Sequence, residues 1–157
     1  MASAEHERLV GLAAVWLKRR GFGVVATELR FGGHLEEPDA IGFRENCSAL
    51  VEVKVSRSDF LADAKKPWRN GVPGLGLYRF YLSPPDVIQL DDLPDGWGLI
   101  HAVGKQLVDV VVPTGNRWPA AHFPDLGDWA KFQHPTCALI ERKALYPIAR
   151  RQTGRTA

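Results

Sequence analysis

Two charged residues interrupt an otherwise apolar run at residues 49–55, and this alternation strongly constrains how the chain can fold. The run reads Ala-Leu-Val-Glu-Val-Lys-Val. Valine at every second position indicates a strand, in which successive side chains point to opposite faces. Glu52 and Lys54 therefore share one face, and the three valines share the other. A carboxylate and an ammonium group are costly to bury, so this face needs a partner or a metal ion to compensate for lost hydration.

Asp39 stands at the start of the preceding predicted strand, residues 39–43, directly after Pro38. If the two strands form a hairpin, Asp39 and Glu52 converge at one end of the sheet. Two carboxylates near a lysine suit a hard divalent cation such as Mg²⁺, which takes oxygen ligands and keeps several waters. The alternative is that Glu52 and Lys54 form the solvated face of an edge strand and that Asp39 is a turn residue. The helices and strands predicted around them favour a site.

Periodicity predicts the other elements. Residues 3–20 are expected to form an amphipathic helix capped by Ser3, and a second helix is expected to begin at Ser56. Additional strands are predicted at residues 24–29, 78–82, 97–102 and 106–112, the last two as a hairpin turned near Gly104. Helices are predicted near residues 125–133 and 135–150. We therefore predict one α/β (α+β) domain, residues 1–157, with a mixed central sheet flanked by helices.

Composition narrows the classes of protein that the chain can belong to. The sequence has 157 residues, of which 45% are hydrophobic and 24% charged, as expected of a soluble globular protein. No apolar run approaches the roughly 20 residues needed to cross a bilayer, and the polar N-terminus argues against a targeting peptide. We therefore expect a cytoplasmic protein without membrane contact. Cys47 and Cys137 lack the spacing of zinc ligands.

Charge is distributed unevenly. The net charge is +2, but residues 131–157 hold six basic residues and one acid, a balance of +5, so the rest of the chain carries 2 − 5 = −3. A basic tail can attract a polyanion, and it can equally serve to keep a terminus solvated. Charge alone does not choose between these interpretations.

The order helix-strand-strand-strand-helix-strand, with Pro38-Asp39 followed by Glu52-Val53-Lys54, resembles the PD-(D/E)XK nuclease superfamily. Residues 51–63 also resemble the MmcB-like DNA-repair proteins and related uncharacterised bacterial and phage proteins. The resemblance covers roughly residues 5–82 and implies a restriction-endonuclease-like core. Residues 83–157 would then be a C-terminal extension with extra strands and helices and a basic tail at 142–157.

The resemblance implies that Asp39 and Glu52 hold Mg²⁺ or Mn²⁺ together with the backbone carbonyl of Val53, and that Lys54 is catalytic. Many members of the superfamily add an acid from the first helix. Glu7, at a family-like spacing from Gly21, and Glu28, in the first strand, are the candidates here. Each could instead be a capping or surface acid near the positive end of a helix. Helical periodicity places Glu5 and His6, rather than Glu7, on the apolar stripe of the first helix, and we expect His6 to pack or hydrogen-bond rather than act as a base.

Several residues after Lys54 could contact nucleic acid. In this interpretation the backbone phosphates of DNA are contacted by five side chains: Ser56, Arg57, Lys65, Lys66 and Arg69. The alternative gives Ser56 the role of a helix cap and makes the basic residues a solvated face. Four tryptophans could likewise stack on bases, although core packing is the favoured interpretation; these are Trp68, Trp97, Trp118 and Trp129.

The function expected from these features is divalent-metal-dependent hydrolysis of DNA phosphodiester bonds, in DNA repair or phage DNA metabolism. Two alternatives remain. One is a non-catalytic nucleic-acid-binding module, and the other is a protein–protein adaptor that uses surface segments such as Trp118-Pro119. Analogy with junction-cleaving relatives suggests a homodimer, and a repair or phage protein would be the partner that recruits the chain.

Overall fold

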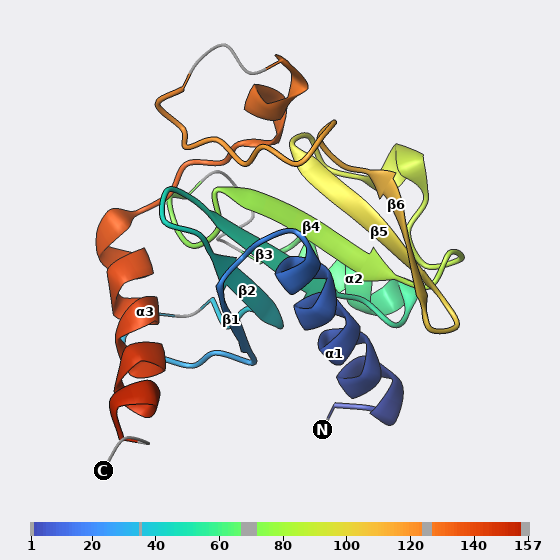
Figure 1. Cartoon of the computed structure of the whole chain (residues 1–157). Coiled ribbons are helices and arrows are strands. Elements are labelled where there is room, and N and C mark those ends of the chain that lie inside the picture. The colour runs from blue at the N-terminus through green and yellow to red at the C-terminus, as the bar shows by residue number, and fades with distance from the viewer. Residues whose placement is uncertain (1, 35, 67–71, 124–126, 155–157) are drawn as a thin grey trace.

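A mixed sheet of six strands forms the centre of the molecule (Figure 1). The computed structural model describes residues 2–34, 36–66, 72–123 and 127–154. The strands lie side by side in chain order: β1 (Val24–Thr27), β2 (Ala40–Phe43), β3 (Ser48–Val53), β4 (Tyr78–Ser83), β5 (Trp97–Val103) and β6 (Gln106–Val111). Strands β3, β4 and β5 are parallel, and the remaining neighbours are antiparallel. The fold is thus α+β, with an open mixed sheet flanked by helices, as the sequence predicted at this level.

Helix α1 (Ala4–Arg19) covers one face of the sheet. The side chain of Ser3 accepts a hydrogen bond of 3.1 Å from the backbone N–H of His6, which confirms the predicted cap. The predicted apolar stripe is buried, because Leu9, Ala13 and Trp16 join one hydrophobic cluster with the valines of β3. The alternation of β3 is therefore confirmed, since Val51 and Val53 face α1 and Glu52 faces away.

The opposite face is covered by two helices of different length and a short 3₁₀ turn. Helix α2 (Arg57–Asp63) lies behind β4 in Figure 1, and α3 (Ala138–Thr153) lies beside β1 and β2. Phe60 of α2 and Ala144 of α3 belong to the second hydrophobic cluster, which also contains Tyr81. A short 3₁₀ turn, η2 (Leu90–Asp92), precedes β5.

The predicted elements differ from the observed ones mainly near the C-terminus. The hairpin of β5 and β6 turns at Gly104, which has a φ of 60°. The segment predicted as a helix at 125–133 is a 3₁₀ helix, η3 (Gly127–Phe132), and residues 125 and 126 lie outside the described residues. Helix α3 begins and ends three residues later than the predicted range of 135–150, and it continues through Pro147.

Tryptophans belong to the core where the structure describes them. Trp97, Trp118 and Trp129 are all about 95% buried, which confirms core packing over base stacking at these positions. Trp68 lies outside the described residues. Trp118 and Pro119 are both buried, so the prediction that they form a surface segment for an adaptor is wrong. The indole of Trp118 packs edge-on against several aromatic rings instead.

The helices differ from membrane spans in length and hydropathy. Within the described ranges, no helix is both long enough and apolar enough to cross a bilayer.

Glu141 anchors α3 to the sheet. Its carboxylate accepts hydrogen bonds from the hydroxyl of Ser48 in β3 and from the N–H of Gly76, at 3.1 Å in the second case. Burial raises the pKa of the Glu141 carboxyl above its ordinary value, although these hydrogen bonds and Arg79 act in the opposite direction. The anchor of α3 is therefore sensitive to protonation.

The raised pKa predicts how stability depends on pH. The folded state holds the Glu141 proton more tightly than the unfolded chain, so this group contributes stability below the unfolded pKa of about 4.3, and the contribution is lost as pH rises through the higher folded pKa. Urea unfolding at several pH values should show that the wild-type protein loses stability relative to Glu141→Gln over this interval. Glu45→Gln, at an exposed position, controls for the loss of one acid. A difference in the free energy of unfolding between wild type and Glu141→Gln that stays constant with pH would contradict this account.

Candidate active site

Asp39, Glu52 and Lys54 meet at one end of the sheet. Asp39 directly precedes β2, and the antiparallel pairing of Ala40 with Val51 sets Asp39 opposite Glu52. A pocket of about 410 Å³ lies there, and its wall includes Asp39, Glu52, Val53 and Lys54. The predicted convergence of the two carboxylates and the lysine is therefore what the structure shows.

Two contacts orient the Asp39 carboxylate. Its Oδ2 accepts a hydrogen bond of 2.8 Å from the backbone N–H of Val53. Its Oδ1 lies 3.2 Å from Nε2 of His6, which reaches the pocket from the first turn of α1. The other ring nitrogen of His6, Nδ1, is buried and has no hydrogen-bond partner among the described residues. The pocket thus contains an imidazole with unused hydrogen-bonding capacity.

Lys54 is buried as a cation among acids. Its side chain is only 4% exposed, and its Nζ lies 3.6 Å from Glu52 and 3.1 Å from Asp63. Burial alone would lower the pKa of Lys54, but neighbouring carboxylates outweigh burial and raise it. In order of their effect these are Glu52, Asp63, Asp59 and Asp39. Lys54 is therefore an ammonium group at neutral pH, suited to stabilise negative charge and unsuited to accept a proton.

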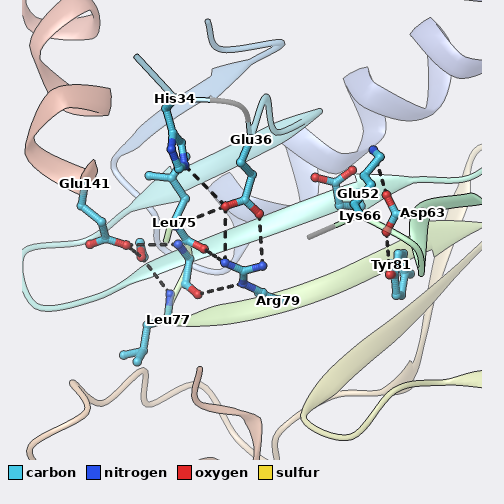
Figure 2. Close-up of polar contacts among 12 residues, drawn as sticks. His34, Glu36, Glu52, Asp63, Lys66, Leu75, Leu77, Arg79, Tyr81 and Glu141 are labelled. Atoms are coloured by element: carbon cyan, nitrogen blue, oxygen red, sulfur yellow. Dashed lines mark hydrogen bonds and ion pairs between the residues drawn. The ribbon is translucent and has the colours of Figure 1, made fainter. Parts of the chain in front are cut away.

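Asp63 links this lysine to two other groups, Tyr81 and Lys66, whose contacts with Asp63 are drawn in Figure 2. It ends α2, is 1% exposed, and accepts a hydrogen bond of 2.8 Å from the hydroxyl of Tyr81. Its other oxygen lies 2.9 Å from Nζ of Lys66 and 3.1 Å from Nζ of Lys54. Asp63 was not among the residues predicted for the site. The available signal was the spacing of Phe60 and Asp63, because residues three apart on a helix share a face and Phe60 belongs to the core.

The acids predicted to complete the site lie elsewhere. Glu7 is exposed on α1, and the position beside Asp39 is taken by its neighbour His6. Glu28 is also exposed, with a φ of 47°, and its backbone N–H donates a 2.9 Å hydrogen bond to the carbonyl of Asp39. Neither side chain lines the pocket. Glu28 therefore supports the Asp39 backbone but adds no carboxylate to the site.

The residues predicted to contact DNA are divided among several roles. Ser56 caps α2 by accepting a 3.2 Å hydrogen bond from the N–H of Asp59, as the alternative interpretation had it. The guanidinium of Arg57 forms an ion pair with Asp92 and donates a hydrogen bond of 2.7 Å to its Oδ1. Lys65 is exposed, and Lys66 lines the pocket. Arg69 lies outside the described residues.

The carboxylates of Asp39 and Glu52 are the candidate metal-ligand oxygens of the pocket. Across the described residues, no group of three or more His, Cys, Asp or Glu side chains could hold a metal ion. Mg²⁺ commonly uses only one or two carboxylates, and completes its six ligands with water and phosphate oxygens. The two carboxylates of Asp39 and Glu52, with the Val53 backbone beside them, fit that pattern.

Comparisons with known proteins bear on the fold. No protein-family model and no curated protein sequence match the chain. A solved structure, the SPO1766 protein of unknown function from Silicibacter pomeroyi, is similar, with a TM-score of 0.65 and 20% sequence identity. The match covers 99% of this chain and 94% of that one. At this identity the similarity shows a shared fold, and it extends over the C-terminal part as well as the first four strands.

The contacts of Asp63 predict a large effect of removing its charge. In Asp63→Asn, Lys54 stays buried beside Glu52 but loses its nearer acid, so we expect the free energy of unfolding to fall by about 3 kcal/mol. Urea unfolding measures this change. Asp59→Asn, an exposed acid in the first turn of the same helix, should cost less than about 1 kcal/mol. Equal losses in the two variants would show that the Asp63 carboxylate does not hold Lys54.

Proposed function

We propose that the chain is a divalent-metal-dependent DNA nuclease of the PD-(D/E)XK type. The observation that carries the proposal is the meeting of Asp39, Glu52 and Lys54 in one pocket at the end of the sheet. The order α1-β1-β2-β3-α2-β4 also agrees with the order of the common core of that superfamily. The two supports are independent, because one concerns side chains and the other the path of the backbone.

Asp39 and Glu52 would hold Mg²⁺ or Mn²⁺, with the carbonyl of Val53 as a third oxygen ligand. When bound there, the metal would polarise a phosphodiester and lower the pKa of a water molecule. The protein prepares this donor set in advance, because the N–H of Val53 holds Oδ2 of Asp39 at 2.8 Å. The carboxylate therefore keeps its orientation without a ligand.

Lys54 would stabilise the negative charge that develops on the phosphoryl oxygens. An ammonium group that is already desolvated needs little reorganisation to do so, and its interaction is stronger than it would be in water. Asp63 and Glu52 hold the group in place and keep it protonated. His6 would contribute through the orientation of Asp39, whose Oδ1 it contacts. The placement of this activity in DNA repair or phage DNA metabolism rests on the sequence resemblance alone.

Cleavage assays test the proposal. With Mg²⁺ or Mn²⁺, the wild-type protein should cut at least one of a panel of labelled linear, single-stranded, flapped and branched DNAs, and EDTA should abolish cutting. Asp39→Asn, Glu52→Gln and Lys54→Met should each reduce the rate at least about 100-fold, because each removes a preorganised electrostatic contribution. Circular dichroism and unfolding curves establish that each variant is folded.

Glu7→Gln and Glu28→Gln serve as matched controls, since both remove an acid outside the pocket. Both should cut at close to the wild-type rate. If the folded wild-type protein cuts none of the substrates, the nuclease proposal fails. Retention of DNA by such a protein would then indicate a binding module, and no retention would indicate an adaptor.

A further inference from the structure

The solvent-facing side of α3 borders an apolar groove that the proposed nuclease site does not use. The groove has a volume of about 600 Å³ and runs between α3 and the segment after β1. Its lining includes Phe31, Leu139, Leu145 and Tyr146. Leu139 and Tyr146 are 61% and 65% exposed, although both are large and apolar or aromatic. We call this feature the α3 groove.

Positive charge surrounds the α3 groove. Arg142 and Lys143 line it, and Arg150 and Arg151 line a second hollow that shares Pro147 with it. The two basic pairs are eight residues apart, which is about 12 Å along a helix axis. The helix has one acid, Glu141, and its carboxylate points inward to Ser48 and Gly76 (Figure 2). The exposed side of α3 is therefore cationic and apolar at the same time.

Aromatic rings stand on both sides of the groove. Phe31 comes from the connection between β1 and β2, and Tyr146 comes from α3. Arg150 lies over the Tyr146 ring, 6.0 Å from its centroid. Lys143 extends toward the same connection, because a Cβ atom built on Gly33 would lie 3.9 Å from its Nζ. Cations and aromatic rings thus occur together along the groove.

We propose that the α3 groove binds single-stranded DNA, with bases packed against Phe31 and Tyr146 and phosphates paired with the four basic residues of α3. Proteins that bind single strands combine a positive groove with aromatic stacking surfaces in this way. A duplex would hide its bases from such rings, so the exposed ring of Tyr146, with the half-buried ring of Phe31 across the groove, favours an unpaired strand. The inference rests on the proposed function, since it gives the same DNA substrate a second contact.

The groove and the Asp39 pocket draw residues from the same connection. Phe31 and Asp39 belong to the same connection between β1 and β2, and Glu36 fastens that connection to the sheet (Figure 2). Glu36 is 1% exposed, and its Oε1 lies 3.1 Å from Nη1 of Arg79 in β4. Phe31 of the groove and Asp39 of the pocket therefore lie on the two sides of this anchor in the sequence.

Binding measured in EDTA tests the groove separately from cleavage. The probe is a fluorescein-labelled oligothymidine of about 16 nucleotides, the upper site size of common single-strand-binding folds, followed by fluorescence anisotropy. Tyr146→Ala should weaken binding about tenfold, because one base no longer has a ring to stack on. The double variant Arg142→Ser with Lys143→Ser should reduce the slope of log K against log salt by about 1.4, since each phosphate that is no longer neutralised accounts for about 0.7.

Matched variants on other surfaces control for general effects. Phe123→Ala removes another exposed aromatic ring, and the pair Lys18→Ser with Arg19→Ser removes two exposed charges from α1. Both should bind as the wild type does. Unchanged binding by Tyr146→Ala, or equal losses in the controls, would overturn the inference. It would also be overturned if an acidic peptide or vesicles with anionic lipid bound through Tyr146 while the oligonucleotide did not.

The cleavage assay on the same variants separates the two proposals. If wild type cuts DNA but Tyr146→Ala binds the oligonucleotide normally, the groove inference alone fails. If Tyr146→Ala loses binding but no protein cuts DNA, the groove inference stands and the nuclease proposal fails.

Discussion

The buried ammonium group of Lys54 is the constraint on which the arrangement of the site depends. Removing a cation from water is expensive unless acids surround it. Glu52, two residues earlier on the same face of β3, supplies one carboxylate, and Asp63 supplies a nearer one. Because Asp63 ends α2, that helix must begin almost immediately after β3 and turn back over it. The cap at Ser56, two residues after Lys54, makes this possible. The same ion pair therefore places α2 and keeps the lysine charged.

The same principle recurs along this face of the sheet (Figure 2). Three polar side chains of β3 and β4 each contact a carboxylate from a segment that covers this face. Ser48 donates a hydrogen bond to Glu141 of α3, and Tyr81 donates one to Asp63 of α2. Arg79 forms an ion pair with Glu36 from the connection after β1. Apolar contacts of Leu50, Phe60 and Ala144 fill the space between them. Hydrophobic packing alone would let these short segments slide, whereas a buried carboxylate that lacks its partner is costly and so specifies one position.

The opposite face shows the contrast. There α1 meets valines, leucines and aromatic rings in one cluster, and its position needs no buried charge. The polar part of α1 that matters to the site is its first turn, where His6 contacts Asp39 at the end of the sheet. The face of the sheet covered by α1 therefore packs through apolar side chains, and the face covered by α2 and α3 holds the buried charged groups.

Local patterns in the sequence were enough to predict the core of the site. The alternation around Glu52 and Lys54 fixes their shared face, and a hairpin register then brings Asp39 opposite Glu52. The caps at Ser3 and Ser56 were equally local. Helical periodicity pointed to His6, and Glu7 was preferred only because its spacing from Gly21 resembles that of the superfamily, whereas the structure places His6 beside Asp39. Asp63 was missed because its partner, Lys54, lies on a different element. Long-range pairs were beyond reach, because Glu36 and Arg79 are 43 residues apart and nothing in either neighbourhood indicates the other.

The connection between β1 and β2 shows why such a long-range pair matters for chemistry. Along it come Phe31, then Glu36, then Asp39, so that an aromatic wall, an anchor and a metal-ligand candidate follow one another within nine residues. The anchor is nearly inaccessible to solvent, and Asp39 is held again at its own carboxylate by the N–H of Val53. Its described residues form no helix or strand, and a connection of this kind would ordinarily be mobile, so that the position of any ligand it carried would be poorly defined. Because the connection is held at these two points, the Asp39 carboxylate has a defined position. A preorganised electrostatic site requires its charged groups to be fixed in this way.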